Sequence, residues 1–209
     1  MTIDEIVQME WQMFQKVNEN GPRAECQNNW KTFEGMRRGQ FEAWSPKARE
    51  SYAGDLDAAM AEGRNLVREK YIRMMEQTDP QQYRALEPYL PVLTQQQYDL
   101  AKEINQLLIS QAEDVFTQFP HVAAYGRPLR QVQDRPFDTS VETYQMGELL
   151  TYSEETLLAL REHARSLAAA GTSLFRTYFE NSLKFYGWKS LEEAEAVAAQ
   201  SPKAHGSSV

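Results

Sequence analysis

Apolar residues recur at three- and four-residue spacing along nearly the whole chain, and the alternation typical of strands is almost absent. Helix start signals precede many of the periodic stretches. Thr2 with Glu5 fits a capping box, and Ser45 followed by Pro46 fits a helix cap and first helical position. The pattern predicts an all-α fold, a single-domain helical bundle of about seven or eight helices.

Caps, prolines and glycines set the bounds of the expected helices. We expect them at about residues 3–17, 24–43, 46–76, 80–91, 94–119, 139–150 and 153–186, with a last short one after residue 190. They form one domain over residues 1–200, with an irregular loop rich in proline and arginine at 120–138 and a disordered tail at 201–209.

Composition and charge restrict the function classes. The 209 residues are 42% hydrophobic, 25% charged and carry a formal charge of −8, which argues against a general nucleic-acid binder. The single cysteine, Cys26, excludes an internal disulfide framework and a multi-cysteine zinc site; its spacing to Trp30 predicts a small core residue. The acidic first residues and the absence of a long apolar run predict a cytoplasmic protein without membrane association.

Polar residues interrupt the apolar stripes of five expected helices. Two are acids, two are bases and two are amides: Glu10, Glu148, Arg37, Lys70, Gln40 and Asn105. A lone charge in a core is costly, so these groups must pair with one another, reach water, or converge on a polar cavity that takes a ligand. The sequence leaves these interpretations open.

The cavity interpretation gives a site hypothesis. A small-molecule enzyme or ligand-binding protein would hold a small anionic substrate with an arginine while an acid or lysine moves a proton, as in an eliminase, isomerase or transferase. Glu10→Gln or Arg37→Met would then abolish binding without unfolding the chain. The expected catalytic residues are Glu10, Lys70 and Glu148, and the expected substrate-binding residues are Trp11, Trp30, Arg37, Gln40, Asn105 and Tyr144.

The alternative is a helical protein-interaction or regulatory module without catalytic activity, whose charged residues only pair with one another. The expected long helix at 153–186 would then supply a homodimer face around Gly171. Gly63, on another apolar stripe, suggests close approach of a helix or ligand.

Motifs for cofactors are missing from the chain. No glutamate stands three residues before a histidine, which disfavours a ferritin-like di-iron site, and no GxxxxGK[ST] or GxGxxG loop occurs. The cofactor therefore stays unknown. Arg127, Arg130 and Arg135 make the 120–138 loop basic; it is either a solvated connection, the default, or a lid that brings cations to an anionic substrate.

Three long segments carry a family resemblance: MTIDEIVQMEWQMFQKVNENGPRAECQNNWKTFEGMRRGQFEAW, GRNLVREKYIRMME and TSVETYQMGELLTYSEETL. They resemble an uncharacterised family of small all-helical bacterial proteins, catalogued as a domain of unknown function. The resemblance implies one all-helical domain and a bacterial cytoplasmic origin. It supplies no catalytic residues, so the site hypothesis depends on the helix faces alone.

Overall fold

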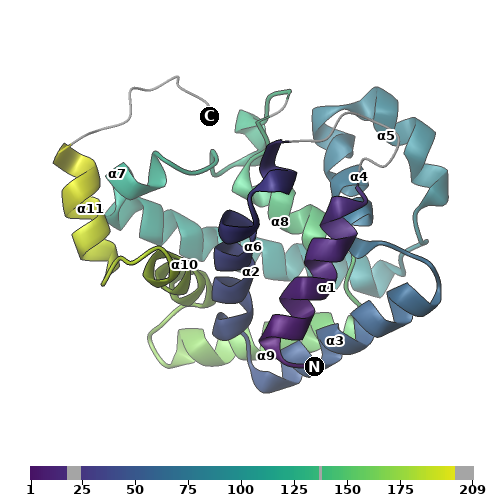
Figure 1. Ribbon diagram of the computed structural model, residues 1–209, viewed down its shortest axis with the longest axis horizontal. Coiled ribbons are helices and arrows are strands. Elements are labelled where there is room, and N and C mark those ends of the chain that lie inside the picture. The colour runs from purple at the N-terminus through teal and green to yellow at the C-terminus, as the bar shows by residue number, and fades with distance from the viewer. Residues whose placement is uncertain (18–24, 137, 201–209) are drawn as a thin grey trace.

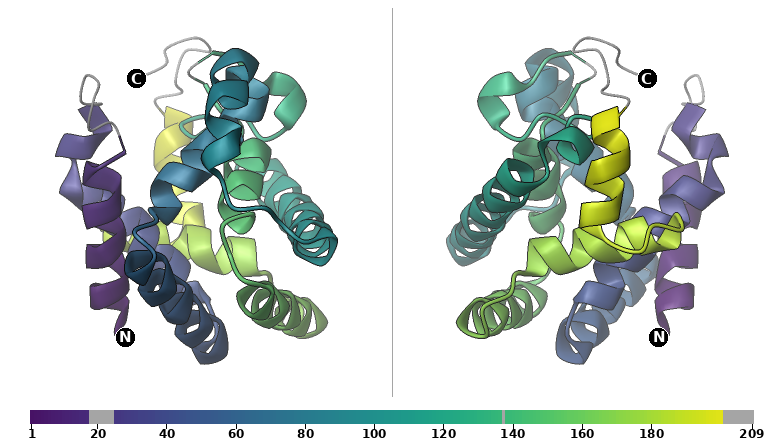
Figure 2. Two further views of the ribbon diagram at one scale, coloured as in Figure 1. Left: turned by 90° about the vertical axis from the view of Figure 1, so that its right-hand side faces the viewer. Right: turned by 90° about the vertical axis from the view of Figure 1, so that its left-hand side faces the viewer.

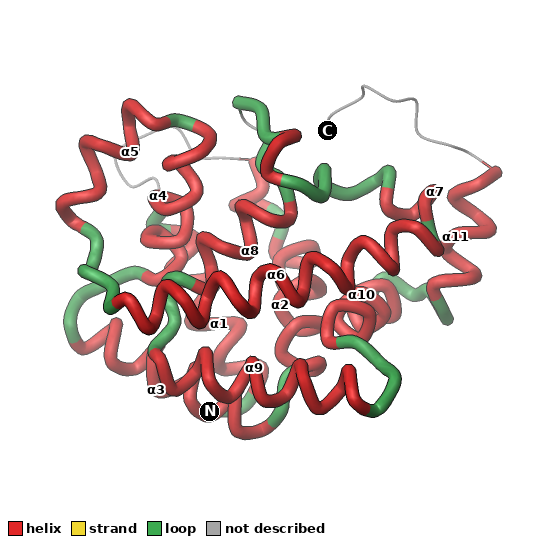
Figure 3. Tube along the Cα trace, turned by 180° about the vertical axis from the view of Figure 1, so that it is seen from behind, coloured by secondary structure: helices red, strands yellow, loops and turns green. Residues whose placement is uncertain are grey.

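The computed structural model describes residues 1–17, 25–136 and 138–200, and in these the chain forms eleven α-helices and three 3₁₀ turns. Within the same residues the one β-type pairing is an isolated bridge between Arg135 and Asp138. Figure 3 shows helices joined by loops throughout. The all-α prediction is confirmed, whereas the expected number of seven or eight helices is wrong.

The α-helices are α1 (Ile3–Gln15), α2 (Trp30–Ala43), α3 (Pro46–Ala61), α4 (Leu66–Thr78), α5 (Pro80–Leu86), α6 (Gln95–Gln118), α7 (Pro120–Ala123), α8 (Val141–Leu149), α9 (Glu154–Ala169), α10 (Leu174–Phe185) and α11 (Leu191–Gln200). The 3₁₀ turns are η1 (Glu25–Asn28), η2 (Glu87–Tyr89) and η3 (Gln131–Gln133).

Two glycines divide helices that the periodicity predicted to be continuous. Gly63 separates α3 from α4 and has a φ of 70°, and Gly171 separates α9 from α10 with a φ of 76°. After each, the next amide N–H donates back to a carbonyl five residues earlier, Arg64 to Ala59 and Thr172 to Leu167. This is the usual way in which a glycine in the left-handed region ends a helix.

The same geometry corrects the roles that the sequence suggested for these glycines. A Cβ atom added at Gly63 or at Gly171 would meet no atom within 4 Å. Gly63 therefore permits a backbone turn and no close approach by another helix. The single long helix expected to carry a dimer face around Gly171 does not exist.

Replacing Gly63 with alanine is expected to lower the free energy of unfolding by about 1–2 kcal/mol, because a Cβ disfavours the left-handed conformation. Gly54, inside α3 with open space around it, is the matched control. Gly54→Ala should raise stability by about 0.5–1 kcal/mol. Urea denaturation measures both, and an equal gain in the two variants would contradict the assigned role of Gly63.

The helices surround two clusters of buried apolar side chains. The larger cluster lies between α1, α2, α3, α4, α8, α9 and the first half of α6; the smaller lies between the second half of α6, α10 and α11. Figure 1 shows α1 between α2 and α4, with α5 beyond α4, and α7 beside α11 at the opposite end. Figure 2 shows the same arrangement from the two sides. Since α6 contributes to both clusters, it connects the two parts of the core.

Capping residues and prolines in the sequence correctly predicted where most of the expected helices begin. The capping box of Thr2 and Glu5 is present, and Ser45 caps α3 with Pro46 at its first turn.

The prediction of Cys26 as a core residue is wrong. The helix expected from residue 24 starts at Trp30, so Cys26 lies on η1 and is exposed. The expected 120–138 loop contains α7 and η3, and the expected tail at 201–209 lies outside the described residues.

Candidate functional site

Four helices bring four charged side chains together inside the larger cluster. Glu10 of α1, Arg37 of α2, Lys70 of α4 and Glu148 of α8 are each less than a tenth exposed. The pairs α1 with α2 and α4 with α8 pack against each other, so one acid and one base face each other across each pair. We call these four side chains the buried charge network.

Arg37 is the centre of the buried charge network. Its Nε and Nη2 donate to the two carboxylate oxygens of Glu10 at 2.6 and 2.5 Å, a bidentate pair. Its Nη1 donates to Glu148 at 2.9 Å, and Lys70 Nζ donates to the other Glu148 oxygen at 2.7 Å. Two acids are thus balanced by two bases.

Neutral groups satisfy the remaining acceptors. The Tyr52 hydroxyl donates to Glu10 at 2.6 Å, and the Tyr152 hydroxyl donates to Glu148 at 2.6 Å. Gln40 Nε2 donates to Glu148 at 2.7 Å while its oxygen accepts from Arg37 at 2.8 Å. Burial of these charges is tolerated because each carboxylate accepts several hydrogen bonds.

The pKa values of Glu148 and Arg37, and of the two tyrosines that donate to the carboxylates, are shifted away from neutral pH. Burial raises the pKa of Glu148, but the charges of Arg37 and Lys70 outweigh it and hold the pKa of that carboxyl well below its usual range. Burial lowers the pKa of Arg37, yet Glu10 and Glu148 raise it well above its ordinary value. Burial and the neighbouring carboxylate raise the pKa of Tyr52 and that of Tyr152 well above the ordinary value. These groups therefore hold their protons or charges firmly near neutral pH.

A cleft of about 190 Å³ opens onto the network. Its buried floor includes all four charged side chains and Tyr52, and its exposed rim includes Cys26, Asn29, Thr32, Met36 and Arg127. Its apolar wall consists of Phe14, Phe33, Leu66, Val67 and Tyr71. Of the six polar residues that interrupt the apolar stripes, all but Asn105 thus meet at one place. Four of these five line the cleft, and the fifth, Gln40, bonds to them from outside its lining.

The ring of Tyr144 in α8 contacts two cations in this cleft. Lys70 Nζ is 3.7 Å from the centre of its ring, and the guanidinium carbon of Arg127 is 4.8 Å from it. Burial raises the pKa of Tyr144 to about 12, so the phenol stays neutral. Lys70 and Arg127 thus line the same cleft and contact the same ring.

Three residues assigned to the site from sequence lie elsewhere. Asn105 of α6 donates to the carbonyl of Glu142 and accepts from Gln145, outside the lining of the cleft. Trp11 and Trp30 form an edge contact at 5.3 Å and pack on Phe33, so they support the wall from behind. The spacing of the two tryptophans correctly placed them on the buried faces of their helices. It could not show whether they line the cleft or lie behind the side chains that line it.

Sequence reasoning missed two contributors and left the role of a third open between a solvated loop and a lid. The spacing of Tyr52 fits the apolar stripe of its helix and gives no sign of a polar partner; Tyr152 is not marked by any motif, although it follows Glu148 by four residues. Arg127 was assigned by default to a solvated loop, and the structure places it at the rim of the cleft, where its Nη1 donates to the Thr139 carbonyl.

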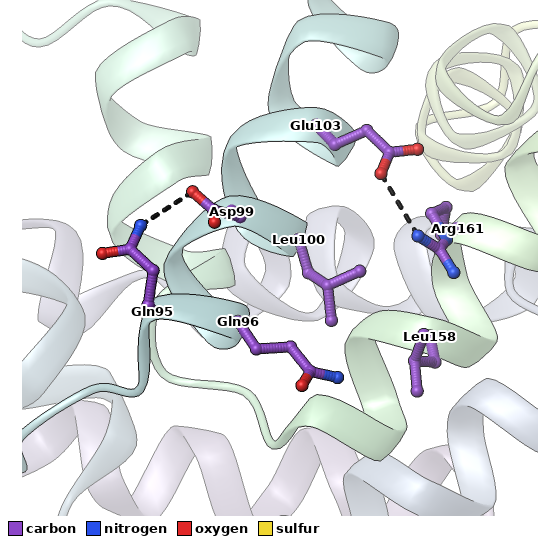
Figure 4. A pocket seen from close by; sticks show the side chains of 7 residues that line it. All are labelled: Gln95, Gln96, Asp99, Leu100, Glu103, Leu158 and Arg161. Atoms are coloured by element: carbon purple, nitrogen blue, oxygen red, sulfur yellow. Dashed lines mark hydrogen bonds and ion pairs between the residues drawn. The ribbon is translucent and has the colours of Figure 1, made fainter.

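A second hollow lies between α6 and α9 and is shallow and open to the surface (Figure 4). Four of its polar side chains pair with one another, Gln95 with Asp99 and Arg161 with Glu103. Among the described residues no group of three or more His, Cys, Asp or Glu side chains could hold a metal ion. In that same part of the chain no helix is both long and apolar enough to cross a membrane.

A family model described as a protein of unknown function, DUF4125, matches residues 1–196. The chain belongs to this family. No curated protein and no solved structure matches it. The family confirms the resemblance drawn from the three sequence segments, and it assigns no activity, so the function must be argued from the cleft.

Proposed function

We propose that the chain binds a small anionic molecule in the cleft above the buried charge network, with Lys70 and Arg127 as the groups that hold the anion. The observation that carries the proposal is that these two cations line one cleft and both lie against the ring of Tyr144, at 3.7 and 4.8 Å from its centre. Lys70 Nζ has three donors, of which Glu148 takes one at 2.7 Å. An ammonium group fixed in place by a buried carboxylate needs little further ordering to bind a ligand.

The buried charge network then serves as the support of the site. Glu10 and Glu148 accept three or more hydrogen bonds each, so neither is a free general base. If the chain is an enzyme, Lys70 is the group placed to stabilise or protonate a developing anion in an eliminase, isomerase or transferase reaction. The catalytic roles proposed for the two acids are less favoured by this geometry than a positioning role.

Native mass spectrometry of the protein as purified, and after incubation with a small-molecule extract of bacterial cells, tests the proposal. We expect an anionic ligand of low mass on the wild type. Arg127→Met should lose at least about tenfold in occupancy or affinity, because it removes a charge-assisted contact at an exposed position. Arg135→Met, an exposed arginine on the same loop outside the cleft, is the matched control. Absence of any adduct, or equal binding by both variants, would contradict the proposal.

One observation favours a protein-interaction module as the second candidate. The residues of α5 and η2 include no buried side chain; Tyr89 in η2 is 82% exposed, and Val92, just after it, is 96% exposed. A mass without adduct, together with a defined oligomer, would favour this candidate.

A further inference from the structure

We infer that the cleft selects a singly charged carboxylate attached to a flat apolar body and rejects a phosphate monoester of the same shape. The inference rests on the proposed function and narrows its ligand class. Three features of the cleft support it: the number of charges, the nature of the facing wall and the volume.

The charges that line the cleft leave one positive charge unbalanced. Glu10 and Glu148 are balanced by Arg37 and Lys70 through hydrogen bonds of 2.5–2.9 Å. Arg127 makes no ion pair within 4 Å with a carboxylate of the residues described; its hydrogen bond goes to a carbonyl. A monoanion would therefore neutralise the cleft.

A dianion would leave a negative charge near the floor, where both carboxylates already have their cations. The interaction of like charges is strong in a partly buried site, where the effective dielectric constant is far below that of water. This repulsion would weaken the binding of a phosphate monoester, which is mostly a dianion at pH 7.5 because its second pKa is about 6.

The wall of the cleft is aromatic. Phe14 and Phe33 stack with ring centres 5.3 Å apart, and Tyr71 stacks on Phe14 at 6.1 Å. These rings and Val67 present an apolar surface to the same cleft that Lys70 lines. A ligand with an anionic end at Tyr144 would place its other end against this surface.

The volume restricts the ligand to about one ring. The 190 Å³ of the cleft is below the roughly 300–1,000 Å³ of pockets for drug-sized ligands, and close to the roughly 150 Å³ cavity that holds benzene in an engineered protein. Benzoate therefore is a suitable probe, with phenyl phosphate and benzyl alcohol as matched compounds of altered charge.

Isothermal titration of the full-length chain at pH 7.5 compares the three compounds. We expect benzoate to bind at least about tenfold more tightly than phenyl phosphate and than benzyl alcohol. At pH 5, where phenyl phosphate carries mostly one charge, its affinity should approach that of benzoate. Arg127→Met should reduce the affinity for benzoate about tenfold and leave benzyl alcohol unchanged, while Arg135→Met changes neither.

Each outcome decides the inference. Phenyl phosphate binding as tightly as benzoate at pH 7.5 would overturn the monoanion inference while the proposed anion site stands. Equal affinity for benzoate and benzyl alcohol would overturn both. Failure of all three compounds to bind would overturn the inference alone, since the adduct measured by mass spectrometry decides the proposed function.

Discussion

Replacing Arg37 with methionine is expected to lower the free energy of unfolding by about 3–5 kcal/mol. Arg37 is 6% exposed, and its guanidinium makes the bidentate pair with Glu10 as well as the contact with Glu148. Without it, Lys70 is the one cation left in the network for two buried carboxylates. One of the two carboxylates would then lack a balancing cation and would have to take up a proton or draw water into the core.

Urea denaturation at pH 7 measures this loss. Arg165→Met is the control, because Arg165 pairs with Glu103 at the surface and should contribute no more than about 1 kcal/mol. The double variant Arg37→Met, Glu10→Gln removes one charge of each sign and should be more stable than Arg37→Met alone. A loss in Arg37→Met no larger than in the control, or no recovery in the double variant, would show that the network does not hold these charges together.

This expectation replaces the one drawn from sequence, in which Arg37→Met abolishes binding and leaves the fold intact. Helix faces alone placed Glu10, Arg37, Lys70 and Glu148 on buried stripes, and the structure buries all four. Burial depends on periodicity within one helix, which the sequence displays directly. The choice of partner depends on how four helices pack, and the sequence does not display that.

Features that depend on residues close together in the chain could be predicted from the sequence, whereas features that depend on packing could not, and this explains the other differences between the predictions and the structure. A capping box such as that of Thr2 and Glu5 involves residues three apart, so it could be predicted. The break at Gly63 could not be predicted from periodicity, because the apolar spacing resumes in α4 after the turn. Arg127 reaches the cleft from a loop without any periodicity, and only the folded chain shows that it lies over Tyr144.

The stability conferred by Glu148 is expected to depend on pH in a defined window. Its folded-state pKa lies well below the ordinary value of 4.5, because Arg37 and Lys70 stabilise the charged form. A depressed folded-state pKa contributes stability that is complete above the unfolded-state pKa and is lost as the pH falls toward the folded-state value. The contribution should therefore be constant from pH 7 to about 5.5 and decline below about pH 4.5.

Glu148→Gln isolates this contribution. The wild type should exceed the variant by about 3–5 kcal/mol at pH 7, because the variant leaves Lys70 and part of Arg37 buried without a balancing charge. This difference in the free energy of unfolding should shrink steadily between about pH 4.5 and 3, because Glu148 takes up a proton in the unfolded wild type and stays ionised in the folded one. Glu180→Gln, at a half-buried surface pair with Arg176, serves as the control and should show a difference within about 1 kcal/mol at every pH. A wild-type advantage that stays constant down to pH 3, or grows, would contradict the ionised state assigned to Glu148 and with it the fixed position of the Lys70 ammonium on which the anion site depends.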